Sequence, residues 1–116
     1  MIYAEGTIAA QSGAYNNPTL TSRKFDAIID DINEDTSVRA VVLRINSPGG
    51  SALESELIYQ QLRRIYKPVV VSMSNVAASG GYYIASASDH IIAPPSSLIG
   101  SIGAYMSFFH LKEFIE

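Results

Sequence analysis

Residues 38–51 read VRAVVLRINSPGGS, and they hold the strongest structural signal in the sequence. The first eight form an almost unbroken apolar run, which is typical of a strand covered on both faces within a parallel sheet. The run stops at the turn 47–50, and Ser51 with Glu54 three positions later has the capping-box pattern of a helix start. The stretch therefore predicts a buried strand, a glycine turn and a helix, in that order.

Strands and helices are expected to alternate along the rest of the chain. A helix is predicted from about Ser22, because four apolar residues share one helical face: Phe25, Ile28, Ile29 and Ile32. The remaining strands are expected at 2–8, 68–73, 91–93 and, interrupted by glycine, 98–106, with a polar loop at 11–21 and helices at 82–88 and 111–116. This order predicts an α/β fold with right-handed crossovers and a mainly parallel sheet.

Length and composition limit the chain to one modest domain. Its 116 residues are 47% hydrophobic and 16% charged, with a net charge of −3 and scattered basic residues, so no nucleic-acid partner is expected. The absence of cysteine excludes disulfides, thiolate metal sites and a cysteine nucleophile. The acidic residues of 30–35 are interpreted as a solvated helix face, and no metal site is expected. No stretch approaches the roughly 18 to 20 apolar residues that cross a bilayer, so this region is expected to be soluble.

Two turns follow successive strands of the predicted sheet, at 47–50 and 77–81. The carboxyl ends of parallel strands meet at one rim, and ligands bind in the crevice there. In the first turn, consecutive glycine amides at a helix N-terminus would hold an oxyanion. The alternative is that these glycines only let the chain reverse. A phosphate cradle is the weaker competitor, because the spacing of a phosphate-binding loop is absent.

The second turn presents Ser79 between small residues, directly before a helix. A nucleophilic serine on a tight strand-to-helix turn needs small neighbours, and the next amide, that of Gly80, must be free to donate. A serine that caps the helix is equally consistent with this turn taken alone. Two such turns facing one crevice favour the nucleophile.

A general base for Ser79 is not evident in the sequence. His90 is expected at the start of a strand, at the opposite edge from Ser79, and His110 is expected at the surface or at a helix entry. Three lysines are expected to be solvated and fully charged: Lys24, Lys67 and Lys112. The chain therefore shows a nucleophile and an oxyanion hole without a convincing base.

Four stretches resemble, in order and spacing, the SppA-type signal peptide peptidases, serine proteases of the caseinolytic protease/crotonase fold class. They are VVLRINSPGGS (41–51), KPVVVSM (67–73), AASGGYYI (77–84) and GSIG (100–103). The resemblance implies that Ser79 is the nucleophile and that the amides of Gly49, Gly50 and Gly80 form the oxyanion hole. Relatives with a Ser-His-Asp triad carry their histidine shortly after the turn at 94–95, where this chain has GSIG. That difference favours the branch with a Ser-Lys dyad.

The resemblance also carries expectations about the complete protein. The general-base lysine comes from outside this chain, since Lys112 falls too soon after Ser79. The expected reaction is cleavage of remnant signal peptides and other hydrophobic peptides through an acyl-enzyme, without a cofactor. A homo-oligomer is expected, anchored to the cell membrane by an upstream segment absent here, with the peptidase domain extracytoplasmic. Tyr82 and Tyr83 are interpreted as core or groove-wall residues.

Two alternatives remain open from the sequence. A crotonase-like acyl-CoA enzyme would share the oxyanion hole without needing Ser79, and a non-catalytic assembly domain would explain the missing base. We interpret residues 1–116 as a single peptidase domain fragment truncated at its C-terminus, because 114–116 show neither a helix C-cap nor a polar tail.

Overall fold

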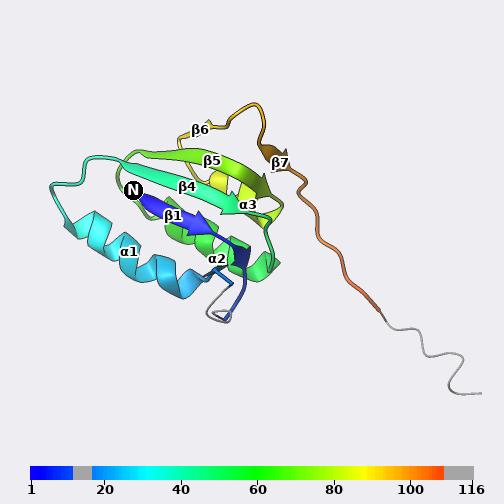
Figure 1. Ribbon diagram of the computed structural model, residues 1–116. Coiled ribbons are helices and arrows are strands. Elements are labelled where there is room, and N and C mark those ends of the chain that lie inside the picture. Colours follow the sequence, from blue (N-terminus) through cyan, green and yellow to red (C-terminus); the bar gives the residue numbers. More distant parts are fainter. Residues whose placement is uncertain (12–16, 109–116) are drawn as a thin grey trace, which may run out of the picture.

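The computed structural model describes residues 1–11 and 17–108, and its centre is a parallel sheet with the strand order β1-β4-β5-β6. A further strand, β7, pairs with the end of β5. Figure 1 shows the three helices on one face of this sheet. The α/β prediction with a mainly parallel sheet is therefore confirmed. The elements in chain order are β1 (Ile2–Glu5), β2 (Thr7–Ile8), β3 (Thr19–Leu20), α1 (Ser22–Glu34), β4 (Val41–Ser47), α2 (Ala52–Arg63), β5 (Val69–Ala78), α3 (Gly80–Ala85), β6 (His90–Ile92) and β7 (Leu98–Gly100).

Side chains of β4 and β5 alternate between the two faces of the sheet. The face away from the helices is the more accessible one, since Val42 on it is 36% exposed. On the same face, Arg44 Nη1 donates to Ser72 Oγ at 2.6 Å. The prediction that 38–45 is covered on both faces is wrong for the described residues, because the described helices all lie on one face. The face toward the helices is at most 4% exposed and consists of Val41, Leu43, Ile45, Val69, Val71 and Met73.

Helix α1 begins at Ser22, as predicted, and is tied to α2 by a buried carboxylate. The backbone N–H of Ser22 donates to Glu54 Oε2 at 2.8 Å. Only half of the predicted capping box forms at the start of α2: Ser51 Oγ accepts from the Glu54 N–H at 3.2 Å, while the Glu54 carboxylate reaches α1 instead. This contact fixes the N-terminus of α1 beside the turn that follows β4.

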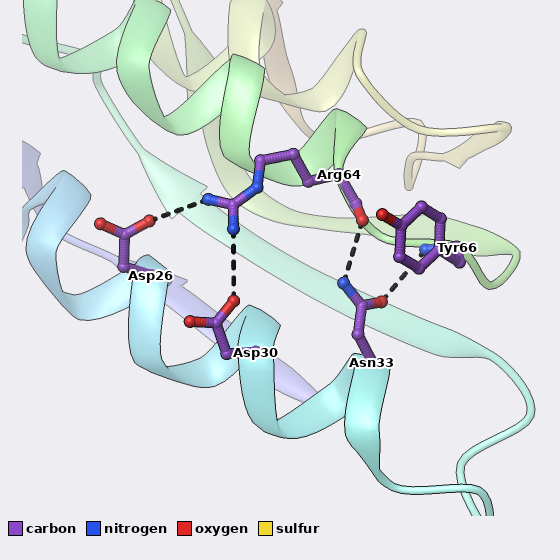
Figure 2. A network of polar contacts seen from close by, with 5 residues as sticks. All are labelled: Asp26, Asp30, Asn33, Arg64 and Tyr66. Carbon is purple, nitrogen blue, oxygen red and sulfur yellow. Dashed lines mark hydrogen bonds and ion pairs between the residues drawn. The ribbon is translucent and has the colours of Figure 1, made fainter.

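A second set of polar contacts joins α1 to the end of α2 (Figure 2). Arg64 forms ion pairs with Asp26 and Asp30, both at 3.3 Å. The Asn33 side chain donates to the Arg64 carbonyl at 3.0 Å and accepts from the Tyr66 N–H at 3.1 Å. All three charged side chains are more than half exposed, so the ion pairs contribute little to stability compared with the apolar packing of the helices.

Element boundaries in the first and middle parts of the chain differ from the prediction. The expected strand 2–8 is divided at Gly6 into β1 and β2, and β3 forms within the expected polar loop by pairing with β2. Strand β5 continues to Ala78, past the predicted end at Met73, because it pairs with β4 up to Ala77 and also with β7. Helix α3 then begins at once, only one residue after the strand.

The segment after β7 runs away from the sheet (Figure 1). The predicted strand 98–106 is shortened to three residues, since the described residues 101–108 lie in no strand and are exposed. The predicted helix 111–116 lies outside the described residues. Within the described ranges, no helix is long and apolar enough to cross a membrane.

Candidate active site

Strand β2 holds the turn after β4 in place. The Ile8 N–H donates to the Gly49 carbonyl at 2.9 Å, and the Ser51 N–H donates to the Ile8 carbonyl at 2.8 Å. Gly50 lies between these bonds at φ +151°, where a Cβ atom would be 2.1 Å from the Ile8 carbonyl oxygen. Only glycine fits at position 50, because the obstruction is rigid backbone.

The turn after β5 places a residue with a side chain in a strained conformation. Ser79 has φ +51° and ψ −122°, which residues other than glycine rarely adopt. Its N–H donates to the Gly100 carbonyl at 2.7 Å, and its carbonyl accepts from the Tyr83 N–H at 2.9 Å. Its hydroxyl makes no capping bond to α3. Ser79 is therefore the N-cap residue at the entry of α3, but its hydroxyl is not used to start the helix.

The two turns touch one another at the rim of the sheet, as predicted. A Cβ atom on Gly49 would lie 2.9 Å from Ser79 Cβ and 2.7 Å from the Gly80 nitrogen. The missing side chain at position 49 is what allows the first turn to approach Ser79 this closely. Tertiary contact thus brings the turns at 47–50 and 77–81 into one site.

The three backbone amides predicted to face an oxyanion are not equivalent. The Gly49 N–H donates to Ser47 Oγ at 3.1 Å, within its own turn. Across the part of the chain that the structure describes, no acceptor is found for the N–H of Gly50 or of Gly80. Two of the three predicted amides are therefore available to a ligand, and the third has a partner in the buried Ser47 side chain.

Two cavities open beside Ser79, and Gly50 lines both of them. The smaller, which we call the α2–α3 cavity, has a volume of about 230 Å³. The larger, which we call the tail cavity, has a volume of about 700 Å³ and is lined in addition by Pro48, Gly49, Ala52, Ser101, Gly103, Ala104 and Tyr105. The α2–α3 cavity is lined in addition by Ala52, Ser55, Glu56, Gly80, Tyr83, Ile102, Gly103 and Ala104.

A hydrogen-bonded pair lies on the wall of the α2–α3 cavity. The Tyr83 hydroxyl donates to Glu56 Oε2, and Gln60 Nε2 donates to Glu56 Oε1 at 2.7 Å. The bond from Tyr83, followed by that from Gln60, holds the pKa of the Glu56 carboxyl below its usual range, and the same carboxylate raises the pKa of the Tyr83 phenol. The Tyr83 ring stacks on Tyr59, with ring centroids 5.0 Å apart.

The sequence predicts only one member of this pair, Tyr83, as a core or groove-wall residue. Tyr83 lines the cavity, as a groove-wall residue would, whereas Tyr82 packs against the core. Glu56 was not singled out. The only signal for it is that Glu56 and Gln60 share a helical face, and this spacing does not reveal that the face looks toward α3.

None of the described lysines or histidines lines either cavity. His90 begins β6 beside Val70, near the start of β5, so it lies at the opposite edge from Ser79, as predicted. Lys24 is exposed, as predicted, and its side chain donates to the Thr19 carbonyl. Lys67 is half-buried instead, and its side chain donates to the carbonyls of Ile32 and Asp35. The other two candidate bases, His110 and Lys112, lie outside the described residues.

Comparison with known proteins identifies a peptidase family. The model of peptidase family S49 matches residues 61–116. Protease 4 of Haemophilus influenzae is 44% identical over 93% of this chain, and the chloroplastic serine protease SPPA of Arabidopsis thaliana is 38% identical over 100% of it. The chain spans 18% of the length of each of these relatives.

Solved structures agree with the predicted caseinolytic protease/crotonase fold class. A variant of the membrane-bound stomatin-specific protease 1510-N, in complex with a substrate peptide, matches with a TM-score of 0.68 and 26% identity over 93% of this chain and 47% of that one. An enoyl-CoA hydratase from Polaromonas matches with a TM-score of 0.59 and 18% identity over 67% of this chain and 39% of that one. The second likeness shows the fold alone.

Proposed function

Since the chain belongs to peptidase family S49, we propose that it supplies the nucleophile, Ser79, of a serine endopeptidase. The observation that carries this proposal is the strained Ser79 backbone, which presents a hydroxyl unused for capping beside the available amides of Gly50 and Gly80. Strain of this kind persists only where surrounding contacts enforce it, and it is concentrated at functional sites.

In the proposed mechanism, Ser79 Oγ attacks the carbonyl carbon of the scissile peptide bond and its proton passes to a general-base lysine that lies outside this chain. The N–H groups of Gly50 and Gly80 donate to the oxyanion of the tetrahedral intermediate. The intermediate collapses to an acyl-enzyme as the lysine returns the proton to the leaving amine, and water then hydrolyses the ester. The resemblance predicts Gly49 as a third donor, but its amide already donates to Ser47. We propose instead that Gly49, which has no side chain, allows the two turns to approach each other closely.

We further propose that the complete protein cleaves remnant signal peptides and other hydrophobic peptides, and that it needs no cofactor. A homo-oligomer attached to the cell membrane, with the peptidase domain on the extracytoplasmic side, is part of the same proposal. The support for these points is the resemblance of the motifs around Ser79 to the signal peptide peptidases, together with membership of family S49.

The crotonase-like alternative is not favoured. The relatives named as proteases are 38% and 44% identical to the chain, whereas the enoyl-CoA hydratase is 18% identical and shares only the fold. The reactivity of Ser79 distinguishes a peptidase from a non-catalytic assembly domain, because only the peptidase is expected to form a covalent adduct there.

The direct test is covalent labelling of the complete protein with a fluorophosphonate probe, with the adduct located by mass spectrometry. We expect an adduct on Ser79, and we expect Ser79→Ala to abolish it and to lower peptide hydrolysis at least about 10³-fold. The matched control is Ser96→Ala, an exposed serine outside both cavities, which keeps labelling and hydrolysis. Folded protein that does not react, or a Ser79→Ala variant that cleaves peptides at the wild-type rate, overturns the proposal.

A further inference from the structure

The α2–α3 cavity carries a single charge beside Ser79. Among the described residues that line it, only Glu56 is ionisable as an acid below neutral pH, and the rest of the wall is made of glycine, alanine, serine, Tyr83 and Ile102. The nucleophile lies on the wall of this cavity, because Ser79 and Gly80 are among its lining residues. A substrate side chain in this cavity would therefore belong to a residue close to the cleaved bond.

The Glu56 carboxylate is fixed but not neutralised. Tyr83 and Gln60 each donate one hydrogen bond to it, one to each oxygen. The ion pairs found among the described residues involve Arg64 alone, so no described cation is paired with Glu56. A carboxylate offers about four acceptor positions, so two donors leave acceptor capacity unused.

The hydrogen bonds to Glu56 also keep it charged. They hold the pKa of its carboxyl below the usual range, so the group is ionised at neutral pH. A negative charge on a wall that is otherwise uncharged attracts a cation more strongly than the same charge would in open water, and it repels an anion. The rigid support from Tyr83, stacked on Tyr59, keeps the carboxylate from turning away.

We propose that Glu56 makes the α2–α3 cavity a selectivity pocket that favours a Lys or Arg side chain of the substrate peptide and disfavours Asp or Glu. This rests on the proposed function, since it concerns peptides that are cleaved at Ser79. The ammonium or guanidinium group donates a charge-assisted hydrogen bond to Glu56, while its methylene stem lies along the apolar wall. An acidic side chain of similar length places two carboxylates together without a cation between them.

The experiment measures kcat/KM of the complete protein on fluorogenic peptides that differ at one position at a time among the four residues preceding the cleaved bond. At each position the residue is Lys, its uncharged analogue norleucine, or Glu. We expect one position at which Lys exceeds Glu by on the order of 100-fold. At that position Glu56→Gln lowers the Lys-to-norleucine ratio at least about tenfold, whereas Glu34→Gln, an exposed carboxylate on α1 outside the cavity, leaves the ratio unchanged.

A second variant separates charge from structural support. Tyr83→Phe removes the phenolic donor that orients the Glu56 carboxylate but keeps its charge, so we expect Lys to remain preferred over Glu, by a smaller factor than in the wild-type protein. A merely structural Glu56 would lower kcat/KM for all peptides by the same factor and leave the ratios unchanged, and that result overturns the proposal. Fluorophosphonate labelling of Ser79 runs in parallel: labelled protein without a Glu56-dependent ratio defeats this inference alone, whereas unlabelled folded protein defeats the proposed function and this inference with it.

Discussion

The two turns at the rim of the sheet both need a positive φ angle, but they place it on different kinds of residue. After β4, the positive φ values fall on Gly49 and Gly50, which have no Cβ atom to strain. After β5, the positive φ falls on Ser79, which has one. The first turn is followed by Ser51, whose side chain caps α2. The corresponding serine at the start of α3, Ser79, makes no capping bond with its hydroxyl.

The difference indicates what each turn is for. A turn that presents only backbone amides can use glycine and avoid strain, but a turn that presents a hydroxyl must keep a side chain at the strained position. A strain of about 1–3 kcal/mol at one residue is tolerated where neighbouring contacts enforce it. At Ser79 those contacts are the backbone bonds to Gly100 and Tyr83. Four experiments test this interpretation, all in the complete protein.

Gly50→Ala has the largest expected effect, because it places a Cβ atom at a position of the first turn where only glycine fits. Its Cβ atom would meet the Ile8 carbonyl at 2.1 Å, so the turn must move. We expect a loss of about 3 kcal/mol or more in unfolding free energy, measured by urea denaturation, together with loss of peptide hydrolysis. Pro48→Ala, at an exposed position of the same turn, is the control and should change stability by less than about 0.5 kcal/mol. Equal stability of the two variants would contradict the role of Gly50.

Ser47→Ala tests the contact that sets Gly49 apart from Gly50. Ser47 is fully buried and accepts the Gly49 N–H, so its removal leaves that N–H without a partner. We expect destabilisation of about 2 kcal/mol by the same denaturation measurement. Ser96→Ala, at an exposed serine, should be neutral. If Ser47→Ala is neutral as well, Gly49 is not restrained by this bond and returns as an oxyanion donor.

Ser51→Ala and Ser79→Ala form a matched pair at the starts of α2 and α3. Ser51 makes a capping bond at 3.2 Å, so its replacement should cost about 1 kcal/mol of stability. Ser79 makes none, so Ser79→Ala should leave thermal stability nearly unchanged while it abolishes hydrolysis. A comparable loss of melting temperature in both variants would show that Ser79 also acts as a cap.

Ser79→Gly should have the smallest effect on stability, in the opposite direction. Glycine adopts φ +51° and ψ −122° without the penalty of a Cβ atom, so Ser79→Gly should be more stable than Ser79→Ala by up to about 1 kcal/mol. Both variants lack the hydroxyl, so a difference in their stability reports the backbone strain that the Cβ atom causes. A less stable glycine variant, by calorimetry, would argue that Ser79 is not strained.

Much of this fold and site could be predicted because the signals are local. The apolar run before Ser47 predicted β4, and the apolar stripe through Phe25 and Ile29 predicted α1. The end of β5 was misplaced, since its extension to Ala78 depends on pairing with β7, which lies some twenty residues further along the chain. Propensity within a window cannot report a partner outside it.

The sequence by itself determined that two turns of small residues follow adjacent parallel strands, and that Ser79 stands in the second of them. Those features follow from local periodicity and from the conformational freedom of glycine. Only the tertiary structure decided that the Gly49 amide is engaged while those of Gly50 and Gly80 are available, and that Glu56 meets Tyr83 beside Ser79. The reason is physical: each of these outcomes depends on how α2, α3 and β2 pack around the turns, and the sequence order of the residues does not specify those contacts.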